Sequence, residues 1–177
     1  MGLFDNIKKK ESSEKTGASA LERAVSADPT LSAFLTDKKI IFFTGGQSKQ
    51  QVFGSLITVL DLPDPSAALK AILSREEAGS TIIADGIAFP HARISGITKI
   101  EAALGIYPAG LEDSSGKTAP VKIILLFLGP ADNMRQHLAF LANAAALFQK
   151  DKIVATLAKQ ATPQAVLKKI KELEKKQ

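Results

Sequence analysis

The sequence contains no cysteine and no tryptophan, and its 177 residues include only two histidines. The lack of cysteine excludes disulfide scaffolds, thiolate zinc sites and cysteine nucleophiles, and it is compatible with a reducing compartment. No apolar run approaches the roughly 18 residues that a membrane helix needs. The first ten residues, MGLFDNIKKK, lack the apolar core of a secretory signal. We therefore expect a cytoplasmic protein without membrane insertion.

The excess positive charge is confined to one end of the chain. The formal net charge is +5, and residues 150–177 hold eight lysines against three acidic residues, so the rest of the chain is neutral overall. Basic and aromatic residues are not interleaved there, which favours a solvated helix over a nucleic-acid-binding surface. We expect no nucleic-acid partner.

Length and composition indicate one folded domain. The chain is 45% hydrophobic, which suffices for one core, and it is too short for two full domains. Residues 1–19 are rich in Lys, Glu, Ser and Gly, and this composition predicts a flexible N-terminal tail. The domain is then expected over residues 20–177, beginning with one or two short helical turns before residue 35.

Apolar patterns and turn residues predict the elements of this domain. Strands are expected at 39–43, 81–84, 87–89, 99–107 and 121–128, with a hairpin about Asp85-Gly86. Helices are expected at 49–60, 65–78, 133–148, 152–159 and 163–174. The apolar face of helix 133–148 is predicted to consist of Leu138, Leu141, Ala145 and Phe148. Helices at both ends of the chain around such strands predict an α/β fold, a mixed β-sheet flanked by helices.

The two histidines stand at chemically informative positions. Pro90 fixes the backbone before His91 and removes a donor, so the chain should turn there and present the imidazole from a loop or element end. Imidazole, with an unperturbed pKa of about 6.5, can be a neutral nucleophile near pH 7. Arg75 precedes His91 by 16 residues, and His137 follows it by 46 residues at the start of a predicted helix.

The segment REEAGSTIIADGIAFPHAR, residues 75–93, resembles the phosphohistidine site of the type-2 enzyme IIA domains of the bacterial phosphoenolpyruvate-dependent phosphotransferase system. These are the fructose, mannitol and nitrogen-regulatory group. The resemblance extends to the His137-Leu138 pair and covers roughly residue 31 to the C-terminus. It implies that His91 is phosphorylated, and that Arg75 and His137 lie beside the same phosphate.

The chemistry of such a site can be stated in physical terms. Phosphoryl transfer between imidazoles needs a neutral ring nitrogen, an in-line approach and donors to the equatorial oxygens, but no metal or other cofactor. His91 would be the nucleophile, and Arg75 and His137 would bind phosphate oxygens. Backbone N–H groups of His91, Ala92 and Arg93 could form an anion-binding nest in the turn. The alternatives are a surface cation for Arg75, a bond to the preceding loop for His137, and a partner contact for Arg93.

Two functions follow from the resemblance. The first is a phosphocarrier, a phosphotransferase component that accepts phosphate from an HPr-like protein on His91 and passes it to an enzyme IIB during sugar uptake. The second is a nitrogen-regulatory enzyme IIA-like protein, whose phosphorylation state controls binding to regulatory targets. An interaction module without phosphorylation is disfavoured, because all three polar positions are present. We expect partners to dock on an apolar rim formed by Ile87, Phe89 and Ile94.

Overall fold

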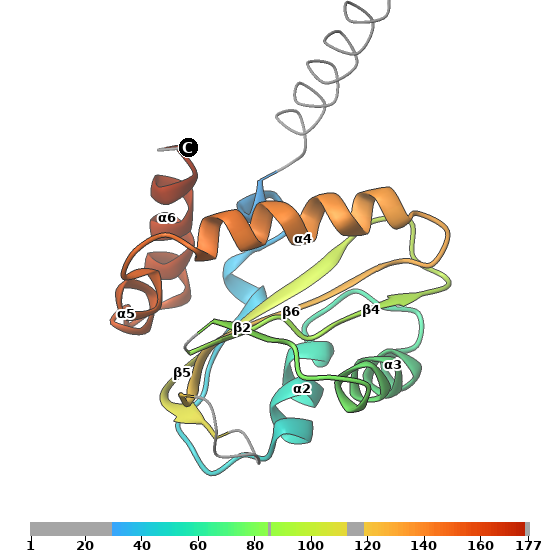
Figure 1. Ribbon diagram of the computed structural model, residues 1–177, viewed down its shortest axis with the longest axis horizontal. Coiled ribbons are helices and arrows are strands. Elements are labelled where there is room, and N and C mark those ends of the chain that lie inside the picture. The colour runs from blue at the N-terminus through green and yellow to red at the C-terminus, as the bar shows by residue number, and fades with distance from the viewer. Residues whose placement is uncertain (1–29, 85, 113–118, 176–177) are drawn as a thin grey trace, which may run out of the picture.

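The computed structural model describes residues 30–84, 86–112 and 119–175 (Figure 1). The predicted tail over residues 1–19, the helical turns expected before residue 30, and most of the polar connection after Leu111 lie outside the described residues. No helix in the described ranges is both long enough and apolar enough to cross a membrane.

A mixed sheet of six strands forms the middle layer of the domain. The strands are β1 (Ile40–Phe42), β2 (Ile82–Ala84), β3 (Ile87–Ala88), β4 (His91–Ile94), β5 (Glu101–Leu111) and β6 (Val121–Pro130). Their order is β1-β5-β6-β3-β2, and β4 pairs with β6 beyond β3. The pairs β5–β6 and β2–β3 are antiparallel, whereas β1–β5, β3–β6 and β4–β6 are parallel. The predicted mixed sheet and hairpin are confirmed.

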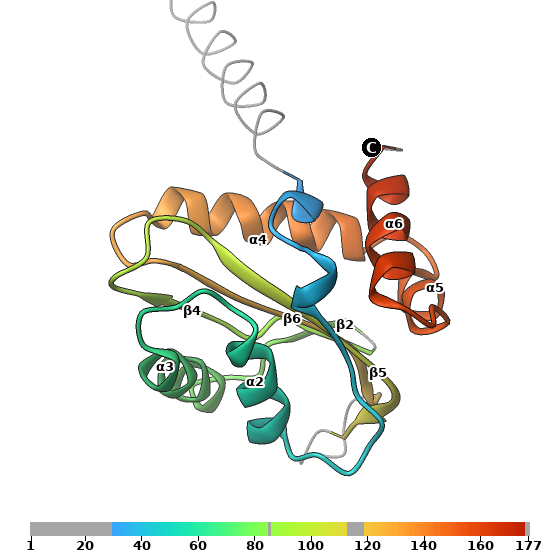
Figure 2. The same cartoon turned by 180° about the vertical axis from the view of Figure 1, so that it is seen from behind.

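Helices cover both faces of this sheet (Figures 1 and 2). One face carries α4 (Met134–Phe148), with α5 (Ile153–Ala158) and α6 (Pro163–Glu174) beside its C-terminal end. The opposite face carries α2 (Lys49–Thr58) and α3 (Pro65–Glu77). Two short 3-10 turns, η1 (Leu31–Ala33) and η2 (Asp37–Lys39), precede β1. The five predicted helices are confirmed.

The apolar run of β6 serves both layers of the core. Successive side chains of a strand point to opposite faces. Ile123, Leu125 and Phe127 therefore belong to the cluster under α4, α5 and α6. The side chains between and after them, Ile124, Leu126 and Leu128, belong to the cluster with α2 and α3. A strand buried on both faces reads as a continuous apolar run rather than an alternating one, as the sequence shows here.

Polar residues define where the helices begin. Ser48 caps α2 through a capping box, since its hydroxyl accepts from the Gln51 N–H and the Gln51 side chain accepts from the Ser48 N–H. Asn133 caps α4, because its side-chain oxygen accepts from the backbone N–H of Gln136 at 3.0 Å. The start of α4 is thereby fixed one turn before His137.

The predicted apolar face of α4 is right at Phe148, which is buried, but it is otherwise wrong in phase. Leu138 is 53% exposed, and Leu141 and Ala145 are only partly buried. The buried positions of the helix are His137, Phe140, Ala144, Leu147 and Phe148. Because α4 carries apolar residues on most of its circumference, periodicity does not determine which stripe faces the sheet. The packing of His137 and Phe140 on Phe127 of β6 does so.

Candidate functional site

His91 is the first residue of β4 and follows a short break between β3 and β4, which both lie alongside β6. Both β3 and β4 pair in parallel with β6, and Phe89 and Pro90 separate them. Pro90 has no N–H for a ladder, but its carbonyl accepts from the N–H of Phe127 at 3.0 Å. The expectation that the imidazole is presented from the end of an element is confirmed, although this end begins a strand and is not a turn.

The imidazole of His91 has one nitrogen engaged and one free. Nδ1 lies 2.7 Å from the carbonyl oxygen of Phe89. A carbonyl can only accept, so Nδ1 carries the proton and Nε2 keeps its lone pair. The ring lies nearly parallel to that of Phe127, with 5.3 Å between centroids and 19° between planes. These contacts hold the ring in one orientation with Nε2 as the available nucleophile.

His137 lies beside His91, as the resemblance implied. The two ring centroids are 5.4 Å apart, with 57° between the ring planes. His137 is only 6% exposed, and its ring also packs at 5.1 Å from that of Phe127. The ring of Phe127 thus contacts both His91 and His137, which are distant in sequence.

Gly129 of β6 allows this approach and was missed by the sequence analysis. A Cβ atom at Gly129 would lie 2.6 Å from Nδ1 of His137, a distance that no real side chain shows. Nδ1 is buried there without a hydrogen-bond partner. The opposite nitrogen, Nε2, is therefore the one left for a group bound beside His91. A glycine inside an otherwise apolar strand was the signal of a close approach.

Both imidazoles are neutral at pH 7. Burial, as the largest cause, and the neighbouring His91 and Arg93 together lower the pKa of His137 to about 4. Burial also lowers the pKa of His91 below its usual value, against the opposing effect of the Phe89 carbonyl. Arg75 adds to the lowering, and Glu76 opposes it. A neutral His91 with a free lone pair is the form that nucleophilic attack requires.

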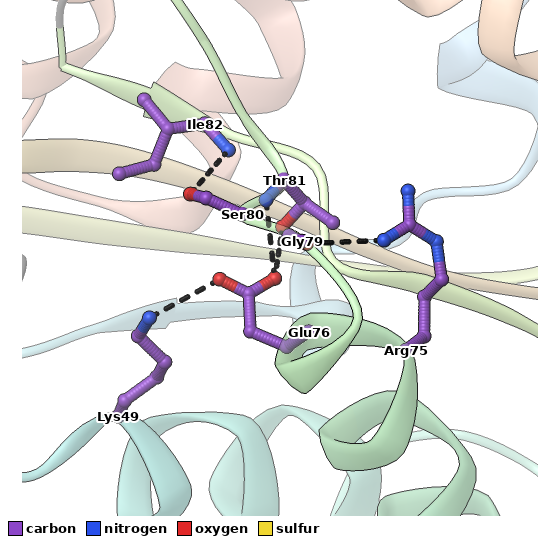
Figure 3. A network of polar contacts seen from close by, with 7 residues as sticks. All are labelled: Lys49, Arg75, Glu76, Gly79, Ser80, Thr81 and Ile82. Atoms are coloured by element: carbon purple, nitrogen blue, oxygen red, sulfur yellow. Dashed lines mark hydrogen bonds and ion pairs between the residues drawn. The ribbon is translucent and has the colours of Figure 1, made fainter.

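Arg75 lies in the last turn of α3, and its charge acts on His91. One of its guanidinium N–H groups donates to the carbonyl of Gly79 at 3.0 Å (Figure 3). The guanidinium is close enough to His91 to lower the pKa of the imidazole. Because a guanidinium has five N–H donors, one bond to Gly79 leaves the others for an anion. The structure thus places Arg75 within electrostatic reach of the expected phosphate.

The anion-binding nest expected at residues 91–93 is wrong in geometry, because these residues form an extended strand. Phe127 donates to the carbonyl of Pro90, so alternate residues from Pro90 onward turn their backbone groups towards β6. Ala92 is one of these, and its N–H belongs to the ladder with β6. The N–H groups of His91 and Arg93 point away from β6.

Arg93 has a structural contact of its own. Its guanidinium donates to the carbonyl of Ala131 at 3.1 Å, which ties β4 to the loop before α4. The side chain is exposed and lowers the pKa of His137. It therefore contributes positive charge next to the two histidines.

The apolar rim expected from Ile87, Phe89 and Ile94 is wrong. Ile87 and Phe89 are buried, and Ile94 is partly buried against the α2–α3 side of the core. Phe89 packs edge-on against Phe148 at 5.3 Å and is therefore core. The sequence placed these residues near His91 but gave no sign that Phe89 packs under Phe148 of α4 or that Ile94 packs on the α2–α3 side.

Met134 and Leu138 form the exposed apolar surface near the site, with 49% and 53% of their surface exposed. At about 100° per residue, His137 lies between Phe140 on one flank of α4 and Met134 with Leu138 on the other. Phe140 packs at 5.1 Å against Phe34, on the η1 side. Met134 and Leu138 therefore lie on the flank that faces β4.

The arrangement can hold an anion. In the parts of the chain that the structure describes, no three His, Cys, Asp or Glu side chains gather into a metal-binding group. The site offers a free imidazole lone pair, a second imidazole and two guanidinium groups. These are groups that bind phosphate or accept a phosphoryl group.

Comparisons with known proteins agree with this chemistry. Residues 33–173 match the family described as "Phosphoenolpyruvate-dependent sugar phosphotransferase system, EIIA 2". The chain is 27% identical over 140 residues to a nitrogen regulatory protein of Pseudomonas aeruginosa, which covers 77% of this chain and 91% of that relative. It is also 27% identical over 141 residues to the fructose-specific EIIABC component of Bacillus subtilis, but that match covers only 22% of the relative and 77% of this chain.

Solved structures show the same fold. The nitrogen regulatory protein IIA-Ntr of Neisseria meningitidis superposes with a TM-score of 0.69 at 23% identity, covering 79% of this chain and 98% of that one. The IIA mannitol structure from Escherichia coli gives a TM-score of 0.61 at 16% identity, covering 77% and 98%. At these identities the likeness establishes the architecture alone.

Proposed function

The chain belongs to the EIIA 2 family of the phosphoenolpyruvate-dependent sugar phosphotransferase system, and from this premise we propose that it is a phosphocarrier that works through a phosphohistidine at His91. An HPr-like protein donates the phosphoryl group, and an enzyme IIB domain receives it. The observation that carries the proposal is the pairing of two neutral imidazoles, those of His91 and His137. Their ring centroids are 5.4 Å apart, and Nε2 of His91 is free.

The proposed transfer is a single in-line displacement. Nε2 of His91 forms a bond to phosphorus while the N–P bond of the donor breaks, and the electron pair returns to the donor imidazole. Arg75 binds equatorial oxygens and offsets their charge, and His137 donates a hydrogen bond from Nε2. The Phe89 carbonyl accepts from Nδ1–H and stabilises the positive charge that the phosphorylated ring acquires. Attack by an enzyme IIB nucleophile then reverses these changes at His91.

The surface beside His91 suits a protein donor. Met134 and Leu138 offer an exposed apolar contact, and the exposed Arg93 supplies positive charge near the two histidines. An apolar centre with charged residues at its edge is typical of protein interfaces that form and dissociate. We place the docking surface on the β4-facing flank of α4, in the cytoplasm.

The second candidate function is regulatory. The nitrogen regulatory protein of Pseudomonas aeruginosa is matched over 91% of its length, whereas the fructose EIIABC component is matched over 22% of its own. Proteins of the regulatory class can therefore consist of little more than this domain. In that case phosphorylation of His91 controls binding of a regulatory target, and the chemistry of the site is unchanged.

Labelling with phosphoenolpyruvate tests the proposal. With enzyme I and an HPr-like carrier, we expect one acid-labile phosphate per chain, and none in His91→Ala. Labelling of His91→Ala at unchanged stoichiometry would place the phosphate elsewhere. A second stage adds enzyme IIB to the labelled protein: transfer supports the carrier function, and retention of the label supports the regulatory one.

A further inference from the structure

Glu76 stands directly after Arg75 in α3 and is the centre of a buried polar network (Figure 3). Its Oε1 accepts from Nζ of Lys49 on α2 at 3.1 Å. Its Oε2 accepts from the backbone N–H of Thr81 at 3.2 Å and from the Thr81 hydroxyl at 2.5 Å. The Glu76 side chain is 9% exposed and Thr81 is 4% exposed. One carboxylate thus joins α2, the end of α3 and the segment that enters β2.

Stability alone is a weak reason for such an arrangement. Burial of a charged pair costs desolvation free energy, and well-packed apolar residues at such positions often stabilise a protein equally well or better. A fully hydrogen-bonded carboxylate does, however, fix the distance between the groups that donate to it. Glu76 and Thr81 lie on either side of the turn at Gly79, and the carbonyl of Gly79 accepts a hydrogen bond from Arg75.

The connection to Arg75 runs through Gly79. Arg75 donates to the Gly79 carbonyl at 3.0 Å, and the Gly79 N–H donates to the backbone carbonyl of Glu76 at 3.2 Å. Gly79 and Ser80 are exposed and have no core contacts of their own. The two bonds from Thr81 to Glu76 close this turn and so hold the Gly79 carbonyl in place (Figure 3).

We propose that Glu76 is a positioning residue for Arg75: by binding Thr81 it fixes the Gly79 turn, and the fixed turn holds the guanidinium beside His91. This inference rests on the proposed role of Arg75 as a phosphate ligand. Glu76 itself does not touch the phosphoryl group.

Lys49 makes this use of a carboxylate compatible with phosphate binding. Glu76 is close enough to His91 to raise its pKa, so an unpaired carboxylate there would also repel a phosphoryl group. The ammonium of Lys49, 3.1 Å from Oε1, offsets that charge. The network therefore supplies a rigid anchor without leaving a net negative charge beside the site.

A double-mutant cycle between Thr81 and Arg75 tests the proposal. Thr81→Val removes the hydroxyl without changing any charge, whereas Thr81→Ser keeps it. Ser80→Ala is the matched control, because it removes a hydroxyl of the same turn that does not contact Glu76. Two quantities are measured for each variant: the affinity for inorganic phosphate, followed by the NMR signals of His91, and the rate of labelling from phosphoenolpyruvate.

Thr81→Val should weaken phosphate binding and slow labelling by roughly three- to tenfold, in the range of coupling between neighbouring residues. Thr81→Ser and Ser80→Ala should stay within about twofold of the wild type, a change of less than roughly 0.4 kcal/mol. In the Arg75→Ala background, Thr81→Val should have no further effect, because the group it positions is gone. The pKa of His91 should rise in Thr81→Val, because the guanidinium that lowers it is no longer held beside the ring.

An equal effect of Thr81→Val with and without Arg75 would overturn the proposal, since the loss would then be general and structural. If Thr81→Val does not fold, Glu76→Gln enters the same cycle. That variant should also couple to Arg75. A third outcome separates the two proposals. If phosphate binding shows the coupling between Thr81 and Arg75, but phosphoenolpyruvate never labels the protein, the proposed function is refuted and the positioning role of Glu76 remains.

Discussion

The two histidines of the site owe their different roles to the atoms around their ring nitrogens. The carbonyl of Phe89 takes the proton of His91 Nδ1, and Gly129 lies against the unpartnered Nδ1 of His137. Burial keeps both rings neutral at pH 7. In the proposed mechanism, this leaves Nε2 of His91 to accept the phosphoryl group and Nε2 of His137 to donate a hydrogen bond.

The lowered pKa of His137 predicts a pH dependence of stability. Its pKa falls from about 6.5 in an unfolded chain to about 4 in the folded protein, so between these values only the unfolded state binds the proton. The contribution of the neutral His137 to the free energy of unfolding is fully present well above pH 6.5, and it is lost as the pH falls towards 4. At pH 5 the free energy of unfolding should be about 2 kcal/mol lower than at pH 7.5 through this group alone.

Urea unfolding at these two pH values measures the effect. His137→Gln should lose about that part of the pH dependence, and the imidazole signals of His137 should not titrate above pH 5. A His137→Gln protein with the same pH dependence as the wild type would show that the ring is protonated as easily in the folded state as in the unfolded state.

At the scale of the elements, α4 has two separate tasks. Its first turn, capped by Asn133, carries His137 into the core beside His91. The flank that turns towards β4 leaves Met134 and Leu138 exposed. The burial of one stripe and the exposure of the next allow one helix to complete the site and to offer a contact to a partner.

Leu138→Asp should therefore weaken docking of the HPr-like carrier at least tenfold, because a charge must be desolvated at an apolar contact. The free energy of unfolding should change by less than about 0.5 kcal/mol, since Leu138 is exposed. Ala146→Asp, on the exposed outer face of the same helix, is the control and should bind as the wild type does. Chemical-shift titration gives both affinities.

Unchanged affinity in Leu138→Asp would contradict this surface. Shifts centred on Lys168 to Lys176, with none around Ile87 to Gly96, would transfer docking to the basic C-terminal end of the chain. That outcome would also give the positive charge of this end a role that the sequence did not indicate.

Helix starts and the hairpin had strong local signals and were predictable. The side of a helix that faces the sheet, and the pairing of the strand at His91, were not. Ser48 and Asn133 mark helix starts, and Gly86 marks the hairpin with a φ of +80°. The exposed side of α4 depends on its contact with Phe127, a residue of another element. The strand at His91 depends likewise on pairing with β6, and the residues around Pro90 could not reveal it.

In the whole molecule, the site lies where the two helical layers meet an edge of the sheet. Among the described residues no strand pairs with the far edge of β4. The α3 helix packs next to β4 and supplies Arg75, while α4 on the other face supplies His137 (Figure 1). His91 and Phe127 are register partners between these layers. The fold thus gathers residues that are far apart in the sequence at one accessible edge.

Sequence reasoning found the residues of the site by their resemblance to a family and not by their distances. Spacings of 16 and 46 residues do not by themselves bring Arg75 and His137 to His91. Glu76 and Gly129 escaped notice because their contacts, with Thr81 and with the His137 ring, are fixed only by the tertiary structure.

The most direct test of the account is the ring nitrogen that carries the phosphate. We expect ³¹P–¹⁵N NMR of the labelled protein to show one phosphoryl group, on Nε2 of His91, because Nδ1 is held by the Phe89 carbonyl. A phosphoryl group on Nδ1 of His91, a phosphoryl group on His137, or a protein that an active donor system does not label would contradict the account.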